Sequence, residues 1–514
     1  MAEPQARPAD GGRSASAGID AARTMAHGEV LARWGRSRPE KVAFVCGERS
    51  VTYGELDHRV NAVAHALARR GVAKGDRVAV LMGNNLEHIE VLLGSFRLGA
   101  VAVPISFRLA PPEAAFVVED SGSMVLVVDE VFAPVAAVVR DLVPGLGTVL
   151  VNGDDPSAAG GGAESYREAM VAADDTPPGV FVTEHDAACI MYTSGTTGRP
   201  KGALLSHFNL FMNSVNSLSA QQLHGDDEVW YGVLPLFHIG GLNGILMYLL
   251  LGATSVIVPL GRFDPAKAVD DLLTHRVTSC CFVQMQWDEI VDHLGDSRPP
   301  FSLRRIVWGT SAAVIPLLEA MSQVFPGVPI YNFFGQTEMS SVTCVLPPQM
   351  FPAKIGSVGK PVMAVEARIV DDEMRDVTQG EVGEIVYRGP TVMQGYWGLP
   401  DATESAFDGG WFHSGDLCRL DDEGYIYVVD RKKDMIISGG ENIYSAEVEA
   451  ALVTYPGGEH LLRRGGGRSR HLSRRRRGGG DRRARRTVGR TAAGRGGAGR
   501  PGTAAEPRGP SGAL

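Results

Sequence analysis

Tyr192-Thr-Ser-Gly-Thr-Thr-Gly-Arg-Pro-Lys-Gly202 is the most informative stretch of this sequence, and it directly follows an apolar run at 187–192. Its hydroxyl side chains, glycines and lysine can bend tightly around phosphate oxygens and direct donors and one positive charge at them. The pattern is not of the Walker type, which requires Ser or Thr after the Lys, whereas Gly202 stands there. A Ser/Thr/Gly surface loop would account for only one or two of these positions. The stretch therefore predicts a loop that binds the phosphates of a nucleotide.

The sequence around this loop alternates predicted strands and helices. A capping-box spacing at Thr52 and Glu55 starts a helix that Gly71 is expected to end. Apolar runs predict strands at 77–82, 100–105, 124–128 and 148–151, and a helix at 85–98 gives the β-α-β order of a parallel sheet. The segment 152–179, rich in Asp, Gly, Ala and Pro, is expected to be a surface connection. Short predicted strands at 365–370, 383–388 and 424–429 indicate a smaller β-rich subdomain.

Charge divides the chain into two unlike parts. Residues 457–514 contain 16 Arg, no Lys and three acidic residues, a net +13, so residues 1–456 carry -22 against the -9 of all 514 residues. With 44% hydrophobic residues, the acidic part is long enough for several cores, which excludes intrinsic disorder for most of it. The Arg/Gly-rich remainder has too few β-branched and aromatic residues to build a core.

The cysteines and the apolar segments indicate the cellular compartment of the protein. The six cysteines form no C-x-x-C pair, which predicts free thiols, no structural zinc and a cytoplasmic location. The N-terminus lacks an apolar stretch that could serve as a secretory signal. The uncharged stretch 239–261 is interrupted by glycines, Asn243 and Pro259, so it predicts a buried helix ending at Gly252 and a strand at 254–258 rather than a membrane span.

Five further motifs follow the loop in order: Leu234-Pro-Leu-Phe-His-Ile-Gly-Gly241, Tyr331-Asn-Phe-Phe-Gly-Gln-Thr-Glu338, Trp411-Phe-His-Ser-Gly-Asp416, Asp430-Arg-Lys-Lys-Asp434 and Gly439-Gly-Glu-Asn442. Together the six resemble the signature of the AMP-forming adenylating superfamily, which includes acyl-CoA synthetases, nonribosomal adenylation domains and luciferases. The resemblance covers roughly residues 30–456 and implies an α/β fold. It implies two mostly parallel sheets with helices plus a smaller β subdomain, followed by a stub of a mobile α+β domain.

The resemblance also implies a domain organisation. We expect a flexible leader at 1–27, an N-terminal adenylating domain at 28–429 and a hinge at 430–434. A remnant of the C-terminal domain would occupy 435–456, and a disordered Arg/Gly-rich tail 457–514.

By resemblance, the loop and Glu338 would bind the triphosphate and its metal ion. Lys201 and the loop hydroxyls would hold the phosphates that leave as pyrophosphate, and Thr337 the α-phosphate. Glu338 supplies a hard oxygen suited to Mg²⁺, with Thr196 as a second ligand. The loop residues expected to contact ATP are Thr193, Ser194, Gly195, Thr196, Thr197, Gly198 and Lys201.

The nucleoside is expected to bind between three other motifs. The Asp416 carboxylate suits the paired ribose hydroxyls, and Arg431 can add a donor. Aromatic faces at Tyr331, Phe333 and Phe334 suit the adenine, without indicating which ring stacks on it. The remaining residues of this expected pocket are Gly309, Thr310, Ser311, Asn332, Gly335, Gln336 and Thr337. At 308–312 many relatives carry Gly-Gly-Ala-Pro, so this wall of the pocket departs from the family.

His238 has two interpretations. A lone His between Phe237 and Ile239 is usually a packed core residue. The resemblance instead places it where the substrate carboxylate enters, and we favour that gating role. The expected catalytic residues are therefore Lys201, Thr337, Glu338 and His238.

The activity implied by the resemblance is a two-step ligation. A carboxylic acid and ATP, with Mg²⁺, give an acyl adenylate and pyrophosphate, and the thiol of CoA then displaces AMP. A fatty or aryl acid is the expected substrate. Alternatives are transfer to a carrier protein or an amine, activation of an unusual acid such as nitrite, or a non-catalytic nucleotide-binding homologue. Nothing in the sequence indicates an oligomeric state.

The C-terminal part departs from the family pattern. Relatives carry a late catalytic Lys in a domain of roughly a hundred residues, but no Lys follows Lys433 here. The motif is lost near Pro456, where Arg, Gly, Ala and Pro begin to dominate, as they do when GC-rich DNA is translated out of frame. We favour a shifted reading frame over an Arg/Gly arm that binds nucleic acid.

Overall fold

The computed structural model describes residues 22–193, 199–259, 261–309, 315–351 and 353–432, and the backbone of β22 (Ile436–Ser438) and β23 (Glu441–Ile443). The chain divides into two compact units, Met1–Val448 and Glu449–Leu514, and everything described lies in the first. Predictions for Ser194, Gly195, Thr196, Thr197, Gly198, Thr310, Ser311, the end of the hinge and the Arg-rich tail fall outside the described residues.

An eight-stranded sheet carries the two ends of the predicted phosphate loop. Within the described residues its order is β19-β9-β8-β4-β3-β5-β6-β7, with parallel pairing from β8 to β7 and antiparallel pairing at β8–β9 and β9–β19. Its strands are β3 (Arg77–Leu81), β4 (Val101–Pro104), β5 (Val125–Asp129), β6 (Thr148–Asn152), β7 (Glu164–Ser165), β8 (Ala187–Thr193), β9 (Lys201–Ser206) and β19 (Gly395–Tyr396).

Helices cover both faces of this sheet because its parallel strands are apolar on both sides. Val78 and Val80 of β3 pack with α3 and α4, whereas Ala79 and Leu81 pack with α5 and α6. The predicted capping box starts α3: the Glu55 backbone N–H donates to Thr52 Oγ1 and the Thr52 N–H to the Glu55 carboxylate. The first helices are α2 (His27–Ser37), α3 (Tyr53–Ala68), α4 (Leu86–Leu98), α5 (Pro111–Ser121), α6 (Ala133–Leu142) and α7 (Tyr166–Val171).

A nine-stranded sheet follows, in the order β16-β15-β14-β13-β12-β10-β11-β1-β2 among the described residues. It is parallel from β14 to β1 and antiparallel at both edges. Its strands are β1 (Val42–Cys46), β2 (Arg49–Thr52), β10 (Val229–Gly232), β11 (Thr254–Ile257), β12 (Ser279–Cys281), β13 (Arg305–Trp308), β14 (Ile330–Gln336), β15 (Ser341–Leu346) and β16 (Lys360–Pro361).

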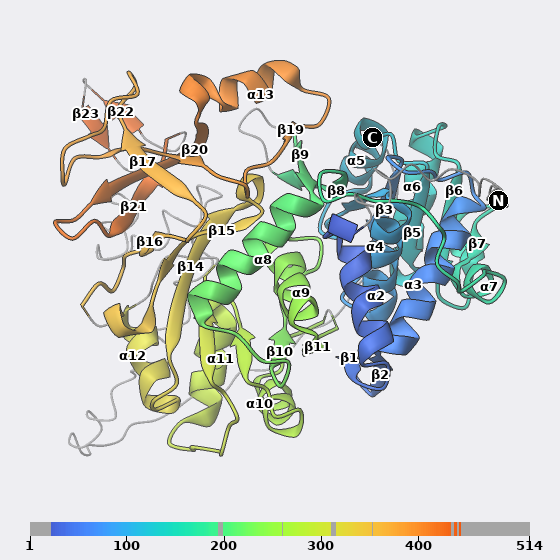
Figure 1. The fold of residues 1–514 in the computed structure, drawn as a ribbon, viewed down its shortest axis with the longest axis horizontal. Coiled ribbons are helices and arrows are strands. Elements are labelled where there is room, and N and C mark those ends of the chain that lie inside the picture. Colours follow the sequence, from blue (N-terminus) through green and yellow to red (C-terminus); the bar gives the residue numbers. More distant parts are fainter. Residues whose placement is uncertain are drawn as a thin grey trace, which may run out of the picture. The chain divides into compact units, whose positions relative to one another are not determined.

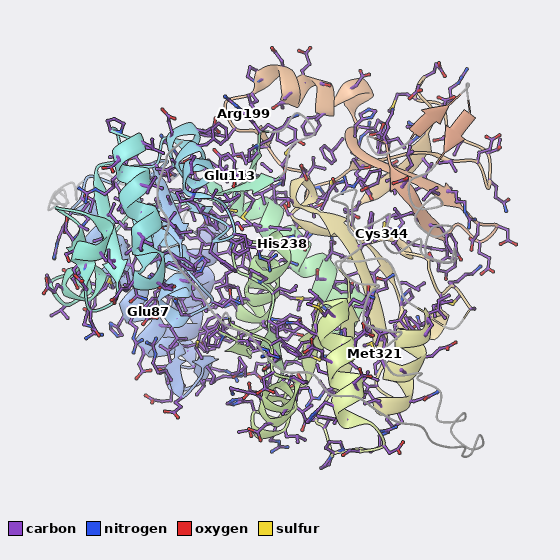
Figure 2. All side chains as sticks on the ribbon, turned by 180° about the vertical axis from the view of Figure 1, so that it is seen from behind. Glu87, Glu113, Arg199, His238, Met321 and Cys344 are labelled. Atoms are coloured by element: carbon purple, nitrogen blue, oxygen red, sulfur yellow. The ribbon has the colours of Figure 1, made fainter. Side chains whose placement is uncertain are left out.

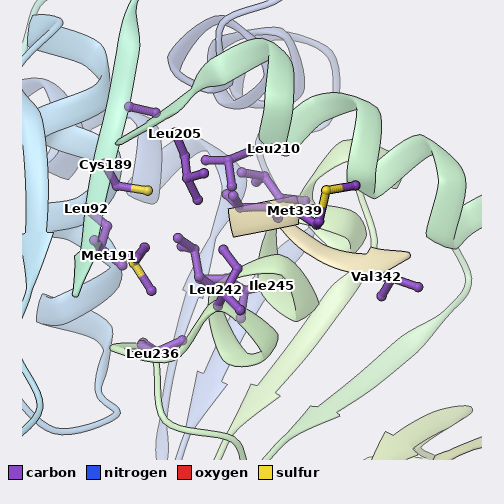
Figure 3. Close-up of a cluster of buried hydrophobic side chains, with 14 of the residues drawn as sticks. Leu92, Cys189, Met191, Leu205, Leu210, Leu236, Leu242, Ile245, Met339 and Val342 are labelled. Atoms are coloured by element: carbon purple, nitrogen blue, oxygen red, sulfur yellow. The ribbon is translucent and has the colours of Figure 1, made fainter. Parts of the chain in front are cut away.

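The two large sheets are joined by helices that contact both. α8 packs against β9 of the first sheet and β15 of the second, and α9 packs against α8 (Figure 1). Figure 3 shows the resulting core, in which Leu205 of β9, Leu210 of α8, Leu242 of α9 and Met339 converge. The later helices are α8 (His207–Gln221), α9 (Ile239–Leu251), α10 (Pro265–Thr274), α11 (Gln284–Leu294), α12 (Ile315–Val324) and α13 (Pro400–Ala406).

The predicted β-rich subdomain is an antiparallel sheet in the order β17-β18-β20-β21. Its strands are β17 (Glu366–Val370), β18 (Gly383–Arg388), β20 (Phe412–Leu420) and β21 (Ile426–Arg431). Single 3₁₀ turns complete the described elements: η1 (Glu130–Phe132), η2 (Pro156–Ala159), η3 (Thr337–Met339), η4 (Pro348–Met350) and η5 (Asp408–Gly410). The architecture is α/β with two mostly parallel sheets and a smaller β subdomain, which confirms the expected fold class.

Two predicted boundaries need correction. The segment 152–179 is more than a surface connection, because it contains η2, β7 and α7, and β7 extends the eight-stranded sheet. The leader does not reach residue 27: Ala26 and His27 are buried where α2 begins, because the His27 ring packs on Phe96 and His207.

Two other predictions agree with the structure. α9 ends at Gly252, whose φ of 69° is the left-handed conformation that glycine favours, and β11 follows. No helix among the described residues is long and apolar enough to cross a membrane. All six cysteines lie in the described part of the chain and are unpaired.

Candidate nucleotide site

The two ends of the phosphate loop are held side by side. Thr193 ends β8, Lys201 begins β9, and the two are direct partners in the antiparallel pair. Beside them, the Tyr192 hydroxyl donates to Asp120 Oδ2 at 2.6 Å, which ties the end of β8 to α5. Although 194–198 lie outside the described residues, the position of Lys201 relative to Thr193 is therefore fixed by the sheet.

A tight turn presents Glu338 at the end of β14. A Cβ on Gly335 would lie 1.6 Å from the Ser341 carbonyl oxygen, so only glycine allows β14 and β15 to approach this closely. Thr337 and Glu338 lie on η3, and the chain then passes through Ser340 (φ 59°) and Ser341 (φ 113°). Positive φ is uncommon for serine and concentrates at functional sites. The backbone is thus held in an unfavourable conformation just after Glu338.

The phosphate loop and the Glu338 turn meet through side chains. Thr193 Oγ1 donates to Glu338 Oε1 at 3.4 Å, and the Tyr396 hydroxyl donates to the same oxygen at 3.1 Å. Lys201 Nζ lies 5.0 Å from the centroid of the Tyr396 ring. Three residues expected to bind ATP or its metal ion, Thr193, Lys201 and Glu338, are therefore brought together.

Sequence reasoning missed Tyr396, which comes from a segment far along the chain. The Met393 N–H donates to the Glu338 carbonyl at 2.8 Å, and the Trp397 N–H to the Gly202 carbonyl at 2.7 Å. The segment therefore bridges the loop strand and the Glu338 turn. The only local signal is two aromatic residues after a glycine, a pattern more typical of packing than of a site.

Asp416 and Arg431 form an ion pair on adjacent strands of the small sheet. They are direct partners in β20 and β21, and Arg431 Nε lies 2.7 Å from Asp416 Oδ1. The Asp416 side chain is 4% exposed, and its Oδ2 is buried without a hydrogen-bond partner among the described residues. A buried acceptor without a partner is costly, so this oxygen is suited to a ligand donor such as a ribose hydroxyl.

The Asp416–Arg431 pair and the Glu338–Tyr396 pair lie close enough for their charges to interact. Burial raises the pKa of Asp416 to about 6, Arg431 opposes the shift, and the negative charges of Glu338 and Glu384 add to it. Burial and the Glu338 charge also raise the pKa of Tyr396, against the effect of Arg431. The Asp416–Arg431 pair and the Glu338–Tyr396 pair therefore belong to one electrostatic neighbourhood.

The expected adenine motif is only partly accessible. Tyr331 is buried in the core beneath the sheet, and the Asn332 side chain is buried and donates to the Ser357 carbonyl at 2.9 Å. Phe333 and Phe334 are half-buried and remain the rings available to a base. A Cβ on Gly309 would lie 2.9 Å from the Phe333 carbonyl oxygen, so this glycine allows β13 and β14 to lie close together at the pocket wall.

His238 is not a packed core residue. It is exposed and caps α9, with its Nδ1 accepting the Gly240 N–H at 3.2 Å (Figure 2). That bond leaves the proton of the neutral ring on Nε2. Partial desolvation and the charge of Arg108 lower the pKa of His238, so the ring favours its neutral form.

The residues present fit Mg²⁺ carried by a nucleotide. Glu338 offers a hard carboxylate oxygen, the ligand type that Mg²⁺ prefers. No group of three or more His, Cys, Asp or Glu side chains that could hold a metal ion occurs in the described part of the chain. Such a site suits an ion that brings most of its ligands as phosphate oxygens and water.

The fold and site together define an α/β protein in which the ends of the predicted phosphate loop lie beside the Glu338 carboxylate. The chain belongs to the AMP-binding enzyme family, whose model matches residues 31–397. It is 37% identical to 2-succinylbenzoate–CoA ligase of Geobacillus kaustophilus over 81% of this chain and 80% of that protein. It is 38% identical to feruloyl-CoA synthase of an Amycolatopsis species over 85% of each chain.

Solved structures agree with this membership. The O-succinylbenzoate CoA synthetase of Bacillus subtilis in complex with ATP and a magnesium ion superposes with a TM-score of 0.73 at 33% identity, over 83% of this chain and 84% of that one. A Mycobacterium tuberculosis fatty acyl CoA synthetase gives a TM-score of 0.75 at 30% identity, over 85% and 84%.

Proposed function

We propose that this chain is an ATP-dependent, AMP-forming ligase that joins a fatty or aryl acid to coenzyme A. The observation that carries the proposal is the contact of Glu338 with Thr193 and with Tyr396, whose ring lies beside Lys201. This contact supports a metal-binding role for the Glu338 carboxylate beside the predicted phosphate loop. All the relatives named above are CoA ligases or synthetases.

The residues take the following roles in adenylation. Lys201 and the loop hydroxyls, including Thr193, bind the phosphates that leave as pyrophosphate, and Thr337 binds the α-phosphate. Glu338, with Thr196, would hold Mg²⁺, which would supply positive charge to neutralise the triphosphate. An oxygen of the acid attacks the α-phosphorus, the bond to the β-phosphate oxygen breaks, and an acyl adenylate forms.

The remaining site residues position the nucleoside and the acid. Asp416 Oδ2 accepts from a ribose hydroxyl, and Arg431 stabilises the ionised carboxylate from the other side. Phe333 or Phe334 packs on the adenine, and His238 gates the entry of the acid. In the second step the sulfur of the CoA thiol attacks the acyl carbon and the thiol proton is released. The bond between the acyl carbon and the phosphate oxygen breaks, and AMP leaves with that electron pair.

CoA is proposed as the acceptor in preference to a carrier protein, because CoA appears in the names of these relatives. We also propose an adenylating domain that ends at residue 429, a hinge at 430–434 and the start of the second domain at 435–456. A cytoplasmic location is proposed because six unpaired cysteines fit a reducing compartment.

The test is ATP–pyrophosphate exchange and thioester formation with a panel of fatty, aryl and small inorganic acids. We expect exchange only with an acid of the right class, and CoA thioester formation with that acid. Lys201→Ala should abolish the exchange. ATP binding without exchange for any acid would contradict the ligase function, and product on a carrier protein but not on CoA would change the acceptor.

A further inference from the structure

Tyr396 lies on β19, which lies along β9, the strand that begins with Lys201 (Figure 1). In the antiparallel pair Tyr396 is opposite Ala203 and Gly395 is opposite Leu204. The Tyr396 N–H donates to Thr403 Oγ1 at 2.9 Å, which anchors its backbone on the other side. The position of the Tyr396 side chain is therefore set by backbone pairing.

The ring and the hydroxyl of Tyr396 contact different charged groups. Lys201 Nζ lies 5.0 Å from the ring centroid, within the range of a cation–π attraction. The hydroxyl donates to Glu338 Oε1 at 3.1 Å, and a hydrogen bond to an ionised acceptor is stronger than a neutral one. One side chain thus contacts both the cation and the carboxylate assigned to the metal–triphosphate complex.

The hydrogen bonds to Glu338 distinguish its two oxygens. Tyr396 and Thr193 both donate to Oε1, at 3.1 and 3.4 Å. Among the described residues no donor reaches Oε2. The shorter bond, from Tyr396, is the one that restricts the orientation of the carboxylate, because the single Thr193 proton is shared between Glu338 Oε1 and the Lys201 carbonyl at 3.5 Å. Oε2 is the oxygen that remains for a hard cation.

We propose that Tyr396 is a positioning residue: it orients the Glu338 carboxylate so that Oε2 is the metal-binding oxygen, and its ring holds Lys201 beside it. The inference rests on the proposed function, because it concerns the same site. Tyr396 acts through Glu338 and Lys201 and has no role of its own in the bonds that form and break.

The test compares ATP binding with and without Mg²⁺ by titration calorimetry on the full chain. Tyr396→Phe keeps the ring and loses the hydroxyl. We expect its affinity for Mg²⁺–ATP to fall about tenfold or more, as is typical when the hydrogen-bond partner of a metal ligand is removed. Its affinity for ATP in the presence of EDTA should stay unchanged. A merely structural role would weaken both.

Two further variants complete the design. Tyr396→Leu also removes the ring, so it should weaken metal-free ATP binding as well. Tyr166→Phe is the matched control, because it removes another tyrosine–glutamate hydrogen bond, from the Tyr166 hydroxyl to Glu90 Oε2 at 3.0 Å, away from the site. It should leave both affinities unchanged.

The outcomes separate this inference from the proposed function. The positioning role is overturned if Tyr396→Phe binds Mg²⁺–ATP as tightly as the parent chain does. It is also overturned if the variant loses as much affinity for metal-free ATP as for Mg²⁺–ATP. If Tyr396→Phe does not fold, Tyr396→Leu still tests the role, because it lacks both the hydroxyl and the ring and should lose more affinity for Mg²⁺–ATP than for metal-free ATP. Equal losses for the two forms of ATP would overturn the inference. A parent chain that binds no ATP overturns the proposed function itself.

Discussion

Arg431 and Asp416 face each other across β21 and β20, with Nε 2.7 Å from Oδ1. The guanidinium stabilises one carboxylate oxygen, while the other is buried without a partner in the described part of the chain. Only one of the two carboxylate oxygens therefore has a hydrogen-bond partner among the described residues. A ligand that donates to Oδ2 would complete it.

Asp416→Asn should weaken the binding of adenosine and ATP by about 1.5–3 kcal/mol, or about ten- to hundredfold, because a hydrogen bond to a charged acceptor is lost. Titration calorimetry measures this directly. The control ligand is 2′,3′-dideoxy-ATP, which lacks both ribose hydroxyls and should bind equally to the parent chain and the variant. A variant that still prefers ATP over the dideoxy analogue would show that Asp416 does not bind the ribose.

Adenosine binding should also depend on pH through Asp416. Burial raises the pKa of this carboxyl to about 6, so it is ionised above that pH and accepts from the ribose. As the pH falls through about 6, the carboxyl becomes protonated, and the affinity should drop, approaching about tenfold per pH unit. Adenosine is the ligand of choice because it has no phosphate that titrates in this range. The Asp416→Asn profile should be flat, and a sloping one would assign the titration to another group.

The buried pair His27 and His207 should make the fold sensitive to acid. Their Nδ1 atoms lie 3.2 Å apart, burial lowers the pKa of His27 to about 4, and the pKa of His207 also lies well below its usual value. The unfolded chain therefore takes up protons between pH about 6.5 and 4 that the folded chain does not. Stability is complete above that window and falls through it, by up to about 1.4 kcal/mol per pH unit for His27.

Urea unfolding at several pH values measures this slope. His27→Gln should reduce the slope between pH about 6.5 and 4, because one buried group that must stay neutral is removed. Equal slopes for the parent chain and His27→Gln would contradict the assignment.

Gly335→Ala should destabilise the fold by about 1–3 kcal/mol, the usual cost of forcing an atom into a packed region. The new Cβ would meet the Ser341 carbonyl oxygen at 1.6 Å, which separates β14 from β15 and displaces Glu338. Gly161→Ala is the matched control, because nothing lies within 4 Å of its Cβ position. Thermal unfolding with and without Mg²⁺–ATP compares the two variants, and equal melting temperatures would mean that the backbone around Gly335 adapts to the added Cβ.

The elements that could be predicted from the sequence are determined by residues that lie close together along the chain. The capping box of Thr52 and Glu55, the glycine after α9 and the apolar strands of the parallel sheets need no information from distant residues. The phosphate loop stays a prediction, since residues 194–198 lie outside the described residues. It rests on glycines, hydroxyls and Lys201 within eleven consecutive positions, which rarely occur together in an ordinary surface loop.

The parts that could not be predicted depend on tertiary contacts. Tyr396 gains its role only when β19 pairs with β9, and no local pattern in the sequence encodes that pairing. Tyr331 and Asn332 belong to the same motif as Glu338, yet both are buried. Consecutive residues of a strand face opposite sides of the sheet, so β14 is covered on both faces at this point. His238 is exposed although its neighbours are apolar, since capping α9 turns its ring toward the Gly240 N–H.

The pairing of β19 with β9 has a consequence for synthesis of the chain. Leu204 and its partner Gly395 are separated by roughly 190 residues, and until the second arrives β9 is an unpaired edge strand open to other chains. At ordinary translation rates this interval lasts roughly 10–40 s. Nascent chains on neighbouring ribosomes are therefore exposed to intermolecular strand pairing during that time, and any chain that stops before residue 395 keeps the edge open.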